Sequence, residues 1–259
     1  MKRSHIVLQL IVNLVLGFLV LLLVRKFFFY SNVTIDLGAW SVFYTVFGVL
    51  YAIIIGFIMI STLEKFDQLK LAIDSEVNEI QNVRILLKYF SDSQKEVINN
   101  VRKALLSYVN SIHSIEWEKM MKKVSLPEFS SELENVIGSV SHLKSEDEND
   151  SIALTSIINT LSGLTECRTK RIYLSKEEVP PPIMKLLIFM SIILVSGFII
   201  MGVQNFWIHI FMVWSLSTTL QLIINLLTDL NSPFEGIWVV EKNHYYGIIS
   251  SIENVITNK

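Results

Sequence analysis

Four long apolar stretches constrain the fold of this chain more than any other feature. They cover residues 6–24, 39–60, 180–201 and 206–227, and each is nearly free of charged side chains. A bilayer core about 30 Å thick requires about 20 such residues in a helix. The first stretch is too long for the apolar core of a signal peptide, and no small-residue cleavage site follows it. We therefore predict four transmembrane helices in two pairs.

The charged residues are concentrated between the two pairs. Only 18% of the chain is charged and 51% is hydrophobic, yet the segment from Ser61 to Val179 is as charged as a soluble protein. We therefore expect four parts. They are a first helix pair (1–61), a water-exposed domain (62–179), a second helix pair (180–228) and a C-terminal segment (229–259).

Positive charges predict the orientation of the helices. Lysines and arginines precede the first span, follow the second and precede the third, whereas the opposite side carries only Arg25 and Lys26. Because cytoplasmic loops are enriched in Lys and Arg, both termini and the central domain are expected in the cytoplasm.

The central domain reads as helical. After the second span, apolar residues recur at three- and four-residue steps from Leu63 to Leu87, which predicts one unbroken helix from the bilayer to about Phe90. Further helices are expected over 97–123, 128–142 and 151–175, with a solvated loop over 144–150. No strand alternation of similar quality occurs, so the predicted fold is an all-α membrane protein.

Several classes of function are not supported by the sequence. A net charge of −2 and the lack of a basic stripe give no reason to expect nucleic acid as a partner. A single cysteine, Cys167, excludes an internal disulfide and a cysteine-based zinc site. There is no phosphate-binding loop, metal-ligand spacing or nucleophile paired with a base. We expect no enzyme activity, catalytic residue, metal or cofactor.

The second span carries two stripes. One is aromatic and aliphatic, and it is a candidate lining for a pore constriction, since apolar necks can gate by dewetting: Phe43, Phe47, Tyr51, Ile54 and Ile58. The other consists of small residues at four-residue spacing, which permit close helix packing: Gly48, Ala52 and Gly56. The alternative is that the small residues pack on a neighbouring helix while the aromatic residues face lipid.

The fourth span has a polar face formed by Thr218, Gln221, Asn225 and Thr228. Polar groups within lipid need partners, so this face is expected to meet protein or water. Interhelical hydrogen bonding and a pore lining explain it equally well. After Asp229, Pro233 ends the helix, Gly236 permits a turn, and Phe234 and Trp238 could anchor at the interface.

The order of these features resembles a known family. The second span ends in Leu63-Glu64-Lys65-Phe66-Asp67, the central domain returns through Arg168 and Arg171 to Pro180–Pro182, and the fourth span exits through Asp229 to Gly236. This order is similar to the bacterial bestrophin-like membrane proteins, whose exit motif reads Leu-Asp-x-Pro-Phe-x-Gly. Here the aspartate, Asp229, lies two residues further from the proline. The resemblance covers nearly the whole chain.

The resemblance implies a function. Bestrophins are pentameric anion channels with four spans per subunit, and their second span lines a hydrophobic neck. Carried over, this implies a homo-oligomer in a bacterial inner membrane, with lipid and small inorganic ions as partners. The acidic run that binds calcium in bestrophins is missing after Gly236, which puts calcium regulation in doubt.

We therefore predict an oligomeric ion channel, selective for anions such as chloride. The alternative is a membrane-anchored signalling or scaffold protein whose cytoplasmic helices bind a partner and whose spans do not conduct. The sequence leaves open whether Glu64, Asp67 or Asp229 pairs with Arg168 or Arg171, or whether these charges stay in water.

Overall fold

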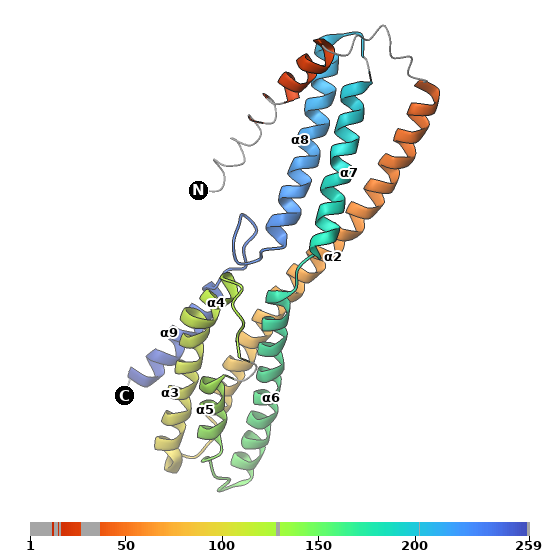
Figure 1. The fold of residues 1–259 in the computed structure, drawn as a ribbon. Helices are drawn as coiled ribbons and strands as arrows, with labels where there is room; N and C mark the ends of the chain where they lie inside the picture. The colour runs from red at the N-terminus through yellow and green to blue at the C-terminus, as the bar shows by residue number, and fades with distance from the viewer. Residues whose placement is uncertain are drawn as a thin grey trace. The chain divides into compact units, whose positions relative to one another are not determined.

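The computed structural model describes residues 12, 15, 17–26, 37–127, 130–201 and 203–257. Every regular element in these ranges is a helix (Figure 1), which confirms the all-α fold class. The chain divides into two compact units. The apolar unit comprises Met1–Glu64, Glu178–Ser232 and Gly236–Trp238, and the charged unit comprises Lys65–Glu177, Pro233–Glu235 and Val239–Lys259.

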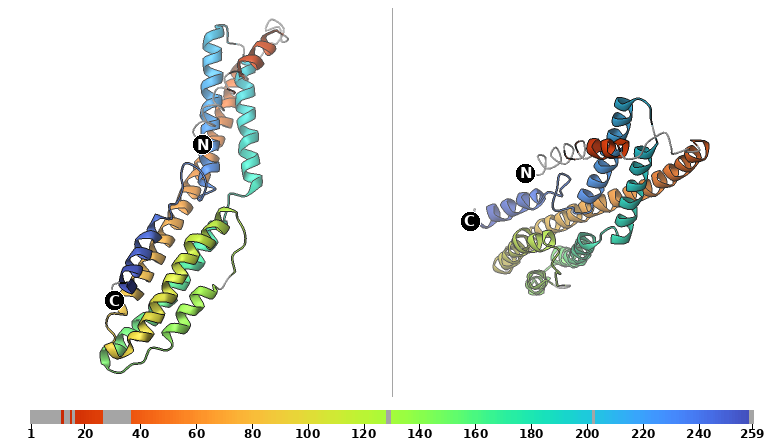
Figure 2. Two further views of the ribbon diagram at one scale, coloured as in Figure 1. Left: turned by 90° about the vertical axis from the view of Figure 1, so that its left-hand side faces the viewer. Right: turned by 45° about the horizontal axis from the view of Figure 1, so that its top comes forward.

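One helix, α2, runs from Leu37 to Leu86 without a break. Its 50 residues correspond to about 75 Å at 1.5 Å per residue, and Figure 2 shows it continuous from two further directions. This confirms the prediction that the second apolar stretch and the apolar stripe after it form one unbroken helix. Leu87 is the last residue of the predicted apolar stripe. Its amide donates a hydrogen bond to the Val83 carbonyl just after the end of α2.

The apolar unit contains two further long helices, α7 (Pro181–Ile200) and α8 (Phe206–Leu230). A proline begins α7, where the missing amide hydrogen removes no helical bond. The Asn205 side chain caps α8 by accepting bonds from the amides of Trp207 and Ile208. Both helices match the predicted third and fourth spans.

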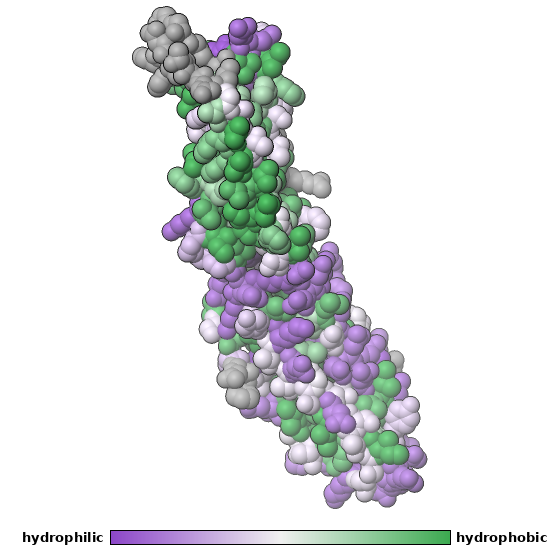
Figure 3. All heavy atoms as spheres, turned by 90° about the vertical axis from the view of Figure 1, so that its right-hand side faces the viewer, coloured by the Kyte–Doolittle hydropathy of each residue, from purple (hydrophilic) through white to green (hydrophobic). Residues whose placement is uncertain are grey.

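By length and composition, three stretches of the described chain could cross a membrane: Gly38–Leu86, Glu148–Ile200 and Phe206–Leu230. In the space-filling view, apolar residues gather over the apolar unit and polar residues over the charged unit (Figure 3). Nine of the 19 residues of the predicted first span, 6–24, lie outside the described residues, so the four-span arrangement stays a prediction. Positions 17–26 are helical.

The charged unit is a helical bundle. After α2 come α3 (Lys95–Ser111), a π-helical turn (Ile112–Glu116), α4 (Trp117–Met121), α5 (Ser131–Val140) and α6 (Glu148–Lys176). A C-terminal helix, α9 (Asn243–Thr257), packs against α3. The sequence analysis placed no helix at α9, and the π-helical turn lies inside the helix predicted over 97–123.

The predicted solvated loop over 144–150 is wrong at its C-terminal end. The Asp147 carboxylate caps α6 by accepting a bond from the Asp150 amide, so the helix begins at Glu148. Asp150 is fully buried and accepts bonds from the Ser91 amide and the Gln94 side chain. The segment was predicted to be solvated because most of its residues are charged or polar, but the Asp150 carboxylate belongs to the hydrogen bonds inside the bundle.

Candidate functional site

The predicted pore stripe of α2 lies at the edge of a packed cluster in the apolar unit. Tyr51 is buried, and its hydroxyl lies 2.8 Å from that of Ser191 on α7. Three other stripe residues are partly buried against the same cluster: Phe47, Ile54 and Ile58. Phe43 is 48% exposed and stacks on Phe47. Whether these side chains line a pore stays a prediction.

The small residues of α2 have open surroundings within this chain. A Cβ added at Gly48 or Gly56 would meet none of the residues that the structure describes within 4 Å. The close approach of helices occurs instead at Gly197 on α7, where an added Cβ would overlap the ring of Tyr44. The Tyr44 hydroxyl donates a bond to the Ile193 carbonyl at 2.8 Å, which fixes α2 against α7.

The polar face of α8 is half shielded. The Thr218 hydroxyl is buried and has no hydrogen-bond partner among the described residues. Gln221 and Asn225 are partly buried. Thr228 is exposed and donates its hydroxyl to the Ile224 carbonyl at 2.8 Å. The two threonines at the ends of this face therefore differ, since the Thr218 hydroxyl is buried and Thr228 is exposed. A role of this face in a pore stays a prediction.

The exit motif after α8 forms a closed loop around Asp229. Its carboxylate accepts bonds from the amides of Ile237 at 2.8 Å and Trp238 at 2.9 Å. Gly236 has a φ of 141°, and an added Cβ there would collide with the same carboxylate. Only glycine fits this position. The aspartate and glycine of the motif thus act together to shape the backbone.

The proline and phenylalanine of the exit motif belong to the charged unit. Pro233 is buried, and its carbonyl accepts a bond from the Val240 amide at 2.9 Å. Phe234 is buried and packs edge-on against Trp117, with ring centroids 5.2 Å apart. Trp238 is half exposed. Phe234 is thus a core side chain within its unit.

A buried cluster of charges lies at the centre of the charged unit. The Glu76 carboxylate, which is fully buried, accepts two bonds from the Arg171 guanidinium, at 2.5 and 3.1 Å. It also accepts the hydroxyls of Tyr108 and Tyr245, each at 2.6 Å. One carboxylate therefore joins α2 to α3, α6 and α9.

A second acid completes the cluster. Glu116 accepts a bond at 2.6 Å from Arg171 and bonds at 2.7 and 3.1 Å from Arg168. The π-helical turn ends at Glu116. It inserts one extra residue into the helical path, which rotates the following residues relative to a regular helix. Two acids and two arginines compensate each other's charge, as a buried cluster requires.

The charges in the cluster shift the pKa values of its members. Burial alone would raise the pKa of Glu116, but Arg171 and Arg168 outweigh it and hold the pKa below its usual value. Burial, followed by the charge of Glu76, raises the pKa of Tyr108 and Tyr245 well above 10. Both tyrosines therefore remain hydrogen-bond donors over the physiological range.

No three His, Cys, Asp or Glu side chains come together to hold a metal ion within the part of the chain that the structure describes. The acidic groups of the central cluster all face arginine or tyrosine donors, so their lone pairs are occupied by the protein.

Comparison with known proteins identifies the family. A family model described as a bestrophin-like domain matches residues 8–245. This chain belongs to the bestrophin-like family. The resemblance predicted from the exit motif is thereby confirmed.

Solved structures share the bestrophin-like fold. Two crystal structures are variants of a bacterial bestrophin homologue from Klebsiella pneumoniae. One has a TM-score of 0.77 at 15% identity and covers 98% of this chain and 100% of its own. The other has a TM-score of 0.74 at 14% identity, covering 95% and 98%. A crystal structure of a membrane protein variant has a TM-score of 0.75 at 15% identity, covering 98% and 99%. No curated protein matched the sequence significantly.

In this bestrophin-like protein, the sequence analysis missed the partners of the two arginines. Arg171 pairs with Glu76, 95 positions away, and Arg168 pairs with Glu116. The membrane-proximal acids that were weighed as partners play no part in these bonds. The available signal was Glu76 itself, a charged residue in the apolar stripe of α2, between Ile73 and Ile80.

Proposed function

We propose that this bestrophin-like protein is the subunit of a homo-oligomeric ion channel in a bacterial inner membrane, with both termini in the cytoplasm. Membership in the bestrophin-like family carries the proposal. Its physical support is α2, a single helix whose first part is apolar enough to cross a bilayer. Copies of such a helix around a common axis would enclose a narrow apolar path.

The proposed neck uses the stripe residues of α2 that keep accessible surface: Phe43, Phe47, Ile54 and Ile58. Tyr51 has a different role in this proposal, since its hydroxyl bonds to Ser191 within the same chain. It positions α2 against α7 and so sets the direction in which the neighbouring stripe residues point. Residues of the proposed neck thus lie both before and after the positioning residue Tyr51 along α2.

The proposed selectivity is for anions such as chloride. The edges of aromatic rings carry positive partial charge, and the predicted neck contains no carboxylate that would attract cations. The polar face of α8 would supply hydrogen-bonding partners next to the path or between helices.

Ion flux through purified protein in liposomes tests the proposal. Chloride and potassium gradients are compared for the wild type, Phe47→Ala and the control Phe211→Ala. Phe211 is an exposed phenylalanine of α8, so its removal should not change selectivity. We expect chloride-selective flux that Phe47→Ala increases or makes less selective.

Other outcomes separate the parts of the proposal. Potassium-selective flux would retain the pore and contradict the anion assignment. A change caused by Phe57→Ala, which lies about 80° around α2 from Phe47, but not by Phe47→Ala would move the neck to that face. A detergent-solubilised monomer without flux in any gradient would contradict the channel and favour the scaffold alternative.

A further inference from the structure

Among the described residues of the charged unit, no element covers one face of α2. Two large apolar side chains of this face are exposed, Leu71 at 62% and Ile85 at 40%, and Tyr89, three residues after the end of α2, is 64% exposed. At 100° per residue, Leu71 and Ile85 lie within about 40° of each other on α2, and about 140–180° around the helix from Glu76. Isolated apolar side chains on a surface are common, so these positions point to a partner only if a second face of the chain matches them.

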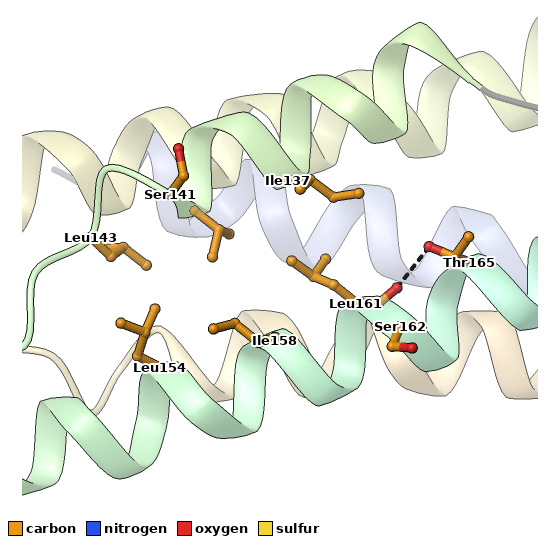
Figure 4. Close-up of a pocket in the computed structure, with 9 residues that line it drawn as sticks. Ile137, Ser141, Leu143, Leu154, Ile158, Leu161, Ser162 and Thr165 are labelled. Atoms are coloured by element: carbon orange, nitrogen blue, oxygen red, sulfur yellow. Dashed lines mark hydrogen bonds between the residues drawn. The ribbon is translucent and has the colours of Figure 1, made fainter.

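A second apolar face lies on α6. Ile158 is 56% exposed and Tyr173 is 64% exposed, and both lie about half a turn away from Arg171. Beside Ile158, α5 and α6 enclose a groove of about 420 Å³, into which Ile137, Leu143 and Leu154 point (Figure 4). This α5–α6 groove contains only apolar and hydroxyl-bearing side chains.

Three contacts give the relative heights of α2 and α6 within one chain. Glu76 bonds to Arg171, Glu79 lies against Gly163, and Ser91 just after α2 bonds to Asp150. The two helices are therefore antiparallel. Interpolation between these contacts places Ile85 level with Ile158 and Tyr89 level with the end of the groove near Leu154, and extension by five residues places Leu71 level with Tyr173.

The segments between these apolar positions match as well. The middle of the α2 face is polar, with Ser75, Asn78 and Asn82, and the middle of the α6 face is polar, with Ser162, Thr165 and Thr169. At the end of the bundle near Leu71, the exposed acid Asp67 is level with the exposed base Lys176. The two faces are thus complementary in apolar pattern and in charge at equal height.

The two faces point in opposite directions. Glu76 and Arg171 face each other across the bundle, and each exposed face lies half a turn behind its own member of that pair. Rotation about an axis roughly along the helices keeps every residue at its height. Such a rotation brings the α2 face of one copy to the α6 face of the next, a head-to-tail contact that can close into a ring.

We propose that the α2 face of each charged unit docks on the α5–α6 groove and α6 face of the next copy of this chain. Leu71 packs on Tyr173 of the next copy, Ile85 packs on Ile158, and Tyr89 enters the groove. Asp67 and Lys176 pair at one end of the contact. The inference rests on the proposed function, since it names the cytoplasmic contact of the channel ring.

Disulfide cross-linking of the full chain in its membrane tests this contact. Cys167 is first replaced by serine, since it is the one cysteine of the chain. Two matched pairs are then made, Leu71→Cys with Tyr173→Cys and Ile85→Cys with Ile158→Cys. The mismatched control is Leu71→Cys with Ile158→Cys, whose heights differ by about 22 Å at 1.5 Å per residue.

Mild oxidation should link the matched pairs into a ladder of dimers and higher species on a non-reducing gel. A disulfide requires Cα atoms about 4.4–6.8 Å apart, so the mismatched pair and the single variants should give no ladder. Equal cross-linking of the mismatched pair would overturn the docking geometry. So would rapid labelling of Ile158→Cys by a water-soluble maleimide in the intact oligomer.

The mass of the solubilised protein separates the two proposals. A stable oligomer that conducts ions but shows no matched ladder would overturn this contact and leave the channel intact. That result would also be expected if lipid or a small apolar molecule filled the groove. A monomer would overturn the contact and the channel together.

Discussion

Replacing Glu76 by glutamine tests the central charge cluster most directly. The substitution preserves the shape of a fully buried side chain, but it removes the charge opposite Arg171 and turns an amide toward hydroxyl donors. Breaking a buried pair from one side costs about 3–5 kcal/mol. Arg171 keeps Glu116 at 2.6 Å, so we expect the lower end, about 3 kcal/mol.

At the size of this unit, 1 kcal/mol shifts the midpoint of thermal unfolding by about 3–5 °C. We therefore expect Glu76→Gln to lower the Tm of the charged unit by about 10 °C, followed by circular dichroism of the detergent-solubilised protein. Removing one donor, by Tyr245→Phe, should lower it less, since one hydrogen bond to a charged group contributes about 1.5–3 kcal/mol.

The matched control is Glu118→Gln. Glu118 also has a basic partner at 2.5 Å, Lys122, but both side chains are more than 60% exposed. Solvent screens such pairs, so this variant should melt with the wild type. If Glu76→Gln lowered the Tm no more than Glu118→Gln does, the cluster would not stabilise the bundle as argued.

Two further predictions concern packing and pH. Gly197→Ala should destabilise the apolar unit by about 1–3 kcal/mol, because the added methyl displaces the Tyr44 ring and breaks its bond to Ile193. Gly48→Ala is the control, since its surroundings are open. Equal melting temperatures of the two variants would contradict the close approach at Gly197. For Glu116, whose pKa is lowered from 4.5 because Arg171 and Arg168 outweigh the effect of burial, stabilisation is complete above the unfolded pKa and lost as the pH falls through the folded pKa. The urea midpoint should therefore decline below about pH 4.5, and Glu116→Gln should flatten that decline.

Helix positions followed from the sequence because periodicity is a local property. Patterns among neighbouring residues predict both the unbroken α2 and the start of α7 at a proline. The structure places both features within a few positions of the prediction. The bestrophin-like family followed from a short motif, Asp229 to Gly236, whose aspartate and glycine are now seen to close one loop.

Side-chain partners did not follow, because they depend on which helices meet. The residues next to Arg171 in the sequence do not indicate that it pairs with Glu76, and those next to Tyr51 do not indicate that it bonds to Ser191. The helix α9 was missed for a related reason: its stability comes from packing on α3 and from the Tyr245 hydroxyl. The open small-residue stripe of α2 and the partly covered aromatic stripe likewise depend on where α7 and α8 lie.

At the π-helical turn, Ile112–Glu116, the number of residues constrains the fold more than the identity of the exposed residues does. The side chains of Ser114 and Ile115 are accessible at this turn, so many substitutions can be absorbed. Loss of a single residue would restore a regular helix and rotate one half of it by about 100° relative to the other. Glu116 would then leave both arginines, or His113 would leave the ring of Tyr246. Substitutions at Ser114 and Ile115 are therefore tolerated more readily than the insertion or deletion of a residue anywhere in Ile112–Glu116.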